Sequence, residues 1–133
     1  MRGLKMNPAI HISWGELIDK LTILEIKSER LVSDSARANV GRELEQLAVF
    51  ANEAGGREPR LAPLQSELKR VNERLWQIED DIRAKEAQKT FDADFIALAR
   101  AVYRNNDKRG RLKQQINALL QSDITEEKQY APY

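Results

Sequence analysis

Residues 61–82 read LAPLQSELKRVNERLWQIEDDI and contain an uninterrupted apolar repeat. Its steps of three and four residues are the a/d pattern of a heptad repeat, which places the apolar side chains on one stripe of an α-helix. The stretch therefore predicts a long helix that packs against a helical partner in the manner of a coiled coil. The apolar side chains alternate steps of three and four residues, at Leu61, Leu64, Leu68, Val71, Leu75, Ile78 and Ile82.

The composition of the whole chain agrees with an all-α protein. With 133 residues the chain is long enough for one domain with its own core, so we expect a single domain over residues 1–133. Aromatic residues make up 6% and charged residues 32% of the chain, a balance typical of an exposed helical bundle. The chain has no cysteine, which excludes disulfides, thiolate metal sites and a cysteine nucleophile.

The charge balance bears on possible partners. The net charge is only +1, so no overall field attracts nucleic acid or an anionic membrane, and we expect neither as a partner. No apolar run is long enough to span a membrane, and residues 1–8 lack the apolar core of a signal peptide. We therefore expect a cytoplasmic protein. Four basic residues at helical spacing form one local ridge, made of Arg100, Arg104, Lys108 and Arg111. The ridge could be a solvated face with salt bridges, or it could contact phosphate or nucleic acid.

Capping signals divide the chain into four helices. Residues 13–16, Ser-Trp-Gly-Glu, form a capping box that starts the first helix. Residues 33–35 can cap the second helix, Gly55 and Gly56 would end it, and Pro59 can open the third. The prediction is an antiparallel bundle of about four helices, in which the last two form a long coiled-coil-like hairpin. We expect helices at about 14–32, 36–54, 60–88 and 93–121, and a docked tail over 122–133.

The first predicted helix carries apolar side chains on two sides. Its main stripe includes Leu17, Leu21 and Leu24, whereas Ile23 and Ile26 fall on the opposite side of the helical wheel. Another part of the same chain or a second subunit could cover this second side. The second possibility predicts a homodimer with Ile23 and Ile26 at its interface.

A polar interruption in the fourth predicted helix is the best candidate for a site. In an antiparallel hairpin that turns near residue 90, positions whose numbers sum to about 180 face each other. The interruption then lies level with a polar stripe on the third helix that includes a tryptophan. Planar amides, guanidinium groups and an indole face suit a small anionic or sugar-like ligand. The candidate ligand-binding residues are Asn72, Trp76, Glu79, Arg83, Asn105, Asn106 and Arg109.

The same residues also fit a structural polar layer. In this alternative Arg109 or Arg83 pairs with Glu79 or Glu73, and the layer fixes the register of the helices without binding a ligand.

Three segments together resemble a known family. SWGELIDKLTILEIK (residues 13–27), FDADFIALARAVYRNND (91–107) and EEKQY (126–130) resemble motifs of a bacterial family of short helical proteins, described as a domain of unknown function. The resemblance covers nearly the whole chain. It implies a stand-alone helical domain of bacterial origin, and it implies no activity.

Enzyme chemistry finds little support in the residues. Glu16 and Asp19 form one acidic pair of the kind with which helical nucleotide pyrophosphohydrolases bind magnesium, but no second pair follows. Residues 18–30 are similar to the first helix of chorismate mutase, although the arginine ahead of that segment is missing. His11 is the only histidine.

We therefore expect no catalytic residue, metal or cofactor. The chain is interpreted as a non-enzymatic interaction or small-ligand-binding module. The alternative is a small helical enzyme that acts on a phosphorylated or carboxylated metabolite.

Overall fold

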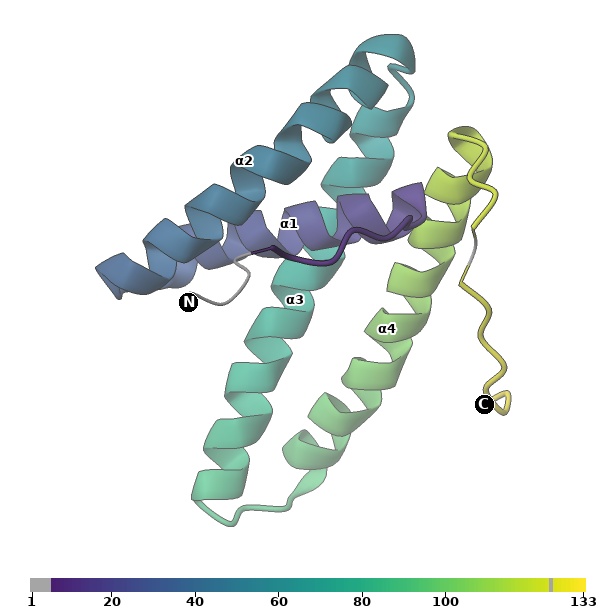
Figure 1. Cartoon of the computed structure of the whole chain (residues 1–133). Coiled ribbons are helices and arrows are strands. Elements are labelled where there is room, and N and C mark those ends of the chain that lie inside the picture. The colour runs from purple at the N-terminus through teal and green to yellow at the C-terminus, as the bar shows by residue number, and fades with distance from the viewer. Residues whose placement is uncertain (1–5, 125) are drawn as a thin grey trace.

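The computed structural model describes residues 6–124 and 126–133, and these residues form an all-α fold. Its four helices are α1 (Trp14–Arg30), α2 (Asp34–Arg57), α3 (Leu61–Ala87) and α4 (Ala93–Leu119). Helices α3 and α4 form the long antiparallel hairpin that the sequence predicts, and α1 with α2 forms a second hairpin (Figure 1). The prediction of an all-α bundle is confirmed.

Helix α1 is the central element of the bundle. It contacts each of the other three helices, and it crosses the α3–α4 hairpin steeply instead of running alongside it (Figure 1). Helix α2 packs mainly on α1 and meets α3 only near the turn that joins them. The second hairpin therefore covers only one half of the first.

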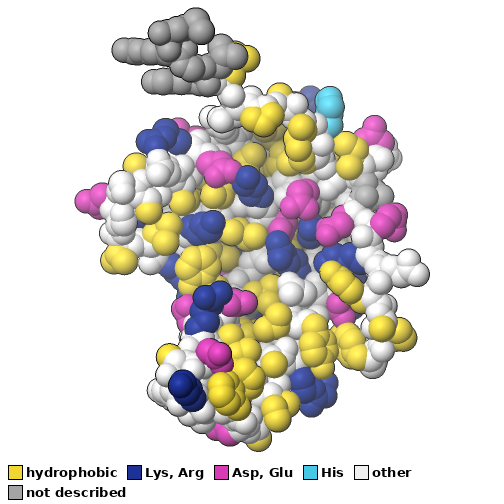
Figure 2. Space-filling view, turned by 60° about the horizontal axis from the view of Figure 1, so that its bottom comes forward, with side chains coloured by type: hydrophobic (Ala, Val, Ile, Leu, Met, Phe, Trp, Pro, Cys, Tyr) yellow, Lys and Arg dark blue, Asp and Glu magenta, His cyan; other side chains and the backbone are white. Residues whose placement is uncertain are grey.

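The apolar repeat on α3 is buried where this cover exists. Leu61 and Leu68 are 1% and 0% exposed, and they share the core with Ile18 of α1 and Ile116 of α4, both 0% exposed. The repeat continues to Ile82, but after Ile78 no residue of the segment 79–104 is buried. The outer half of the hairpin thus lacks a covering layer within the described chain, and Figure 2 shows hydrophobic side chains exposed among charged ones at this end.

The sequence predicts the helix starts better than the helix ends. Ser13 Oγ accepts a hydrogen bond from the Glu16 amide at 3.1 Å, so the predicted cap of α1 is confirmed. The expected end of α2 at Gly55 and Gly56 is wrong, because the helix continues to Arg57. Neither glycine adopts the left-handed conformation that ends a helix, and the Glu58 amide still donates to the Ala54 carbonyl at 2.8 Å.

The end of α1 also differs slightly from the prediction. Helix α1 ends at Arg30, two residues before the predicted boundary at 32, and the side chain of Val32 is 94% exposed. None of the helices in the described ranges combines the length and hydrophobicity that a membrane span needs.

The C-terminal segment 126–133 lies beside α4 and runs back toward the middle of that helix (Figure 1). The Tyr133 ring packs edge-on against Tyr103 of α4, with the ring centroids 5.0 Å apart. We call this segment the arm.

A close contact fixes the beginning of α1 on α4. The Gly15 amide donates to Asn117 Oδ1 at 2.6 Å, and the Trp14 amide donates to Ser122 Oγ at 2.9 Å. A Cβ atom on Gly15 would lie 2.4 Å from the Lys113 carbonyl oxygen, which is a backbone atom and cannot rotate away. Only glycine fits at this position of α1.

Two glycine substitutions test this contact. Gly15→Ala should lower the free energy of unfolding by about 1–3 kcal/mol, because the added methyl group forces α1 away from α4. Gly41→Ala in α2 is the matched control, since a Cβ there meets no atom within 4 Å. It should leave stability unchanged or raise it by about 0.5–1 kcal/mol through better helix propensity. Urea unfolding of both variants measures the difference, and equal effects would contradict the close contact.

Candidate functional site

The predicted site residues meet in one groove between α1, α3 and α4, below the crossing of α1. We call it the central groove; its volume is about 520 Å³. Trp76 from α3 and Asn106 from α4 both line it, together with the apolar side chains of Leu75 and Val102. The hairpin register is as predicted, since Arg74 Nη1 donates to Asn105 Oδ1 at 3.4 Å and these numbers sum to about 180. The predicted residues in the groove are Asn72, Trp76, Glu79, Arg83, Asn106 and Arg109.

Asn105 lies outside the central groove. Its side chain is 6% exposed, donates to the Ala101 carbonyl at 2.8 Å and accepts from Arg74. These two contacts hold the Asn105 side chain between α3 and α4, whereas its neighbour Asn106 lines the groove. The prediction of Asn105 as a ligand contact is corrected to a packing role.

The two isoleucines predicted at a subunit interface also lie at the central groove. Ile26 is 0% exposed within the single chain, so the prediction that it faces a second subunit is wrong for this residue. Ile23 is half-buried and lines the same groove. Helix α1 has apolar side chains on two sides because α3 and α4 lie against the side that α2 does not cover. The homodimer itself stays a prediction.

A buried ion pair forms one wall of the central groove. Asp19 of α1 is 1% exposed and accepts two hydrogen bonds from Arg109, at 2.8 Å from Nε and 2.5 Å from Nη2. Asn72 of α3 donates to the same carboxylate at 3.0 Å and to Thr22 Oγ1 at 2.9 Å. The layer that joins α1, α3 and α4 is therefore fully hydrogen-bonded, and the hydrogen bonds that Arg109 donates to Asp19 raise the pKa of Arg109.

The structural alternative for Arg109 is thus realised with a different partner. Glu79 and Glu73 are the partners that the sequence suggests, but Glu79 instead accepts from Arg83 at 3.1 Å, in a solvent-exposed pair at the groove. The partner of Arg109 is Asp19, which lies 90 residues away from it in the sequence. In the sequence, Asp19 stands out only as part of an acidic pair with Glu16 that could bind magnesium, and this pair did not predict Arg109 as a partner.

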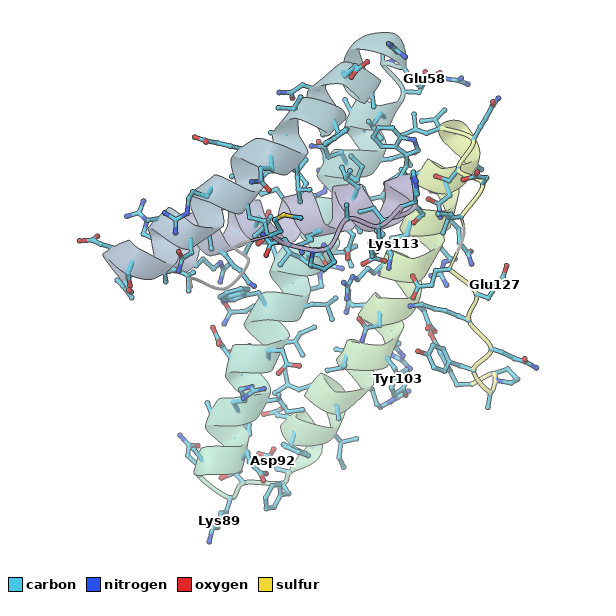
Figure 3. All side chains as sticks on the ribbon, viewed as in Figure 1. Glu58, Lys89, Asp92, Tyr103, Lys113 and Glu127 are labelled. Atoms are coloured by element: carbon cyan, nitrogen blue, oxygen red, sulfur yellow. The ribbon has the colours of Figure 1, made fainter. Side chains whose placement is uncertain are left out.

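A second charged cluster attaches the arm. Lys113 extends from the part of α4 that lies near the beginning of α1 (Figure 3) and is 6% exposed. Its Nζ lies between two carboxylates, 2.9 Å from Glu16 of α1 and 2.5 Å from Glu126 of the arm. Burial works to lower the pKa of Lys113, but the hydrogen bonds to Glu126 and Glu16 outweigh it and raise that pKa. Glu16 therefore binds α4 and does not complete the predicted capping box with the Ser13 amide.

These clusters account for the buried polar groups. Within residues 6–124 and 126–133, every buried side-chain nitrogen or oxygen has a hydrogen-bond partner. The same ranges contain no group of histidine, cysteine, aspartate and glutamate side chains that could hold a metal ion. Polar groups that remain for a ligand are consequently those that solvent reaches, chiefly the half-buried Asn106 and the exposed Asp80 of the central groove.

The buried pair gives a first test of the site. Arg109→Ala should lower the free energy of unfolding by about 3–5 kcal/mol, because the nearly inaccessible Asp19 carboxylate loses its charged partner. Arg83→Ala is the matched control in the same groove, and it should stay within about 0.5 kcal/mol of wild type because the Arg83 side chain is 79% exposed. Denaturant unfolding measures both. A small effect of Arg109→Ala would show that Asp19 reaches water.

The arm gives a pH test. Hydrogen bonding to Lys113 lowers the pKa of Glu126, so this bond stabilises the fold fully above the ordinary pKa of glutamate and loses its effect as the pH falls through the lowered pKa. Glu126→Gln should therefore be less stable than wild type at neutral pH and equal to it in acid. Glu127→Gln, at an exposed position of the arm, should match wild type throughout. A difference between Glu126→Gln and wild type that does not change with pH would contradict the ionic bond.

Comparison with known proteins gives a family but no function. A family model described as a family of unknown function (DUF6165) matches residues 8–132, which is nearly the whole chain. No curated protein and no solved structure matches. The three motifs quoted from the sequence lie within the matched range, and in the fold their residues meet at the Lys113 cluster and in the central groove. The chain belongs to the DUF6165 family of unknown function.

Proposed function

We propose that this chain is a non-enzymatic binding module whose small ligand occupies the central groove. The observation that carries the proposal is the pairing of a half-buried indole, Trp76, with a half-buried amide, Asn106, across a groove of about 520 Å³. Apolar walls with a few polar groups, in a cleft of this size, are characteristic of small-molecule sites.

The charges favour a neutral, sugar-like ligand over an anion. Both arginines in the groove already have carboxylate partners, Asp19 for Arg109 and Glu79 for Arg83. An anion that captured Arg109 would leave Asp19 buried and unpaired, which is strongly unfavourable. Asp80, which makes no ion pair within the described residues, adds a negative charge to the groove.

A hydroxyl-rich ring matches the remaining groups. Hydroxyl groups both donate and accept, so they can bond the Asn106 amide and the Asp80 carboxylate at once. The apolar face of a sugar ring can pack on the Trp76 indole and bury aromatic surface. The ligand class that we propose is therefore a neutral saccharide.

The buried polar layer supports a binding role over a catalytic one. A general base must be able to reach the proton that it removes. Asp19 is 1% exposed and is held by Arg109 and Asn72, so it is not available to a substrate. His11 lies exposed on the segment before α1 and does not line the groove.

Titration of the pure protein with neutral mono- and disaccharides, and with inorganic phosphate and citrate as anions, tests the proposal. We expect a saccharide to bind and to raise the melting temperature. Trp76→Ala should weaken that binding at least tenfold, or about 1.4 kcal/mol. Phe50→Ala in α2 is the control, because Phe50 is 52% exposed and lies outside the groove.

Three results would overturn the proposal. In the first, the anions bind and no saccharide does. In the second, a saccharide binds equally well to wild type and Trp76→Ala. In the third, incubation with a bound saccharide yields a new product, which would show an enzyme.

A further inference from the structure

We propose that the ligand site continues across α4 into a second groove, formed with the arm, and that its full ligand is an oligosaccharide of several rings. This inference rests on the proposed function of the central groove. It adds a second binding region, a longer ligand and a role for the C-terminal residues.

The second groove, which we call the arm groove, lies between α4 and the arm and has a volume of about 620 Å³. Val102, Asn106 and Arg109 line both grooves. These residues are spaced by four and three positions, so they form one stripe along α4. The two grooves therefore lie on either side of a single stripe, and one extended molecule can contact both.

Aromatic side chains stand on both sides of this stripe. Trp76 lies in the central groove, whereas Tyr103, Tyr130 and Tyr133 line the arm groove. The tyrosines are 40%, 74% and 75% exposed, which leaves much aromatic surface in water. A chain of sugar rings can cover such separated aromatic faces in turn, because each ring offers an apolar face of its own.

The polar groups between the aromatic faces suit the same ligand. Asn106 and Asp107 of α4 and Lys128 of the arm line the arm groove, so an amide, a carboxylate and an ammonium group lie within one region. Linked hydroxyl groups can accept from the ammonium and donate to the carboxylate without a net charge on the ligand. A proline-rich peptide is the other ligand that uses aromatic grooves, but it offers few donors for such a mixed lining.

The position of the arm is fixed, so the arm groove is a formed site. Glu126 binds the buried Lys113, and the Lys128 side chain lies close to Gly110, where an added Cβ would be 3.3 Å from Lys128 Nζ. The Tyr103–Tyr133 ring contact holds the far end of the arm on α4. Both ends of the arm thus contact the same helix.

A length series tests the inference on the full chain. We would titrate it with cello-, malto- and chito-oligosaccharides of increasing length. Within the series that binds, affinity should rise at least tenfold from the shortest binding member to the longer ones. Tyr130→Ala combined with Tyr133→Ala should remove this gain and keep the affinity for short members, whereas Trp76→Ala should weaken binding at every length. Phe91→Ala is the control, because Phe91 is 58% exposed and lies outside both grooves.

The outcomes separate the two proposals. If short saccharides bind through Trp76 but affinity does not rise with length, the extension into the arm groove is wrong and the central site stands. If affinity rises with length but the tyrosine variants keep the gain, the arm groove is not the second region. Binding of a proline-rich peptide without binding of any saccharide would overturn both proposals.

Discussion

The structure depends on the ion pair between Asp19 and Arg109. It joins the middle of α1 to α4, and Asn72 attaches the same carboxylate to α3, so one buried group connects both hairpins. A buried pair of this kind contributes little net stability, since desolvation offsets most of the attraction. Its consequence is specificity, because a crossing that kept Asp19 buried but moved it away from Arg109 would leave its charge unpaired. The steep crossing of α1 is thus better explained by this layer than by the apolar core, which tolerates many similar packings.

Under the proposed function, the same pair limits what the central groove could bind. An arginine that faces a groove normally suggests an anion. Here the guanidinium has already satisfied its charge with Asp19, and the groove keeps only its shape, its indole and its amide for recognition. The ion pair that secures the fold is therefore the reason why we propose a neutral ligand and not an anion.

Much of the fold was predictable from local pattern, and the central contact was not. The repeat on α3 and the turn near residue 90 set the register of the hairpin, and this register alone brings Trp76, Asn106 and Arg109 into one groove. The start of α1 was predictable from Ser13, whose side chain caps this helix as expected. These features depend on residues a few positions apart or on the geometry of paired helices.

The missed features depend on tertiary contacts. Asp19 and Arg109 meet only because α1 crosses the hairpin, and no spacing within one helix encodes that crossing. Gly55 and Gly56 read as a helix end, yet the buried Ala51 and Ala54 extend the packed face of α2 up to them, and packing outweighs propensity. Asn105 lies outside the groove because Arg74 and the Ala101 carbonyl hold its side chain, and the contact with Arg74 of another helix cannot be read from local spacing.

The Lys113 cluster links the two grooves to the fold in the same way. Glu16 of α1 and Glu126 of the arm share one ammonium group that is nearly inaccessible to solvent. The two carboxylates are 46% and 40% exposed, so salt partly screens their attraction to the ammonium group. Because Glu16 and Glu126 contact the same ammonium group, the arm and the beginning of α1 are attached to α4 at one point. In this arrangement the residues that would recognise a ligand are positioned by charged layers, while the apolar repeat that decides the fold lies mostly away from them.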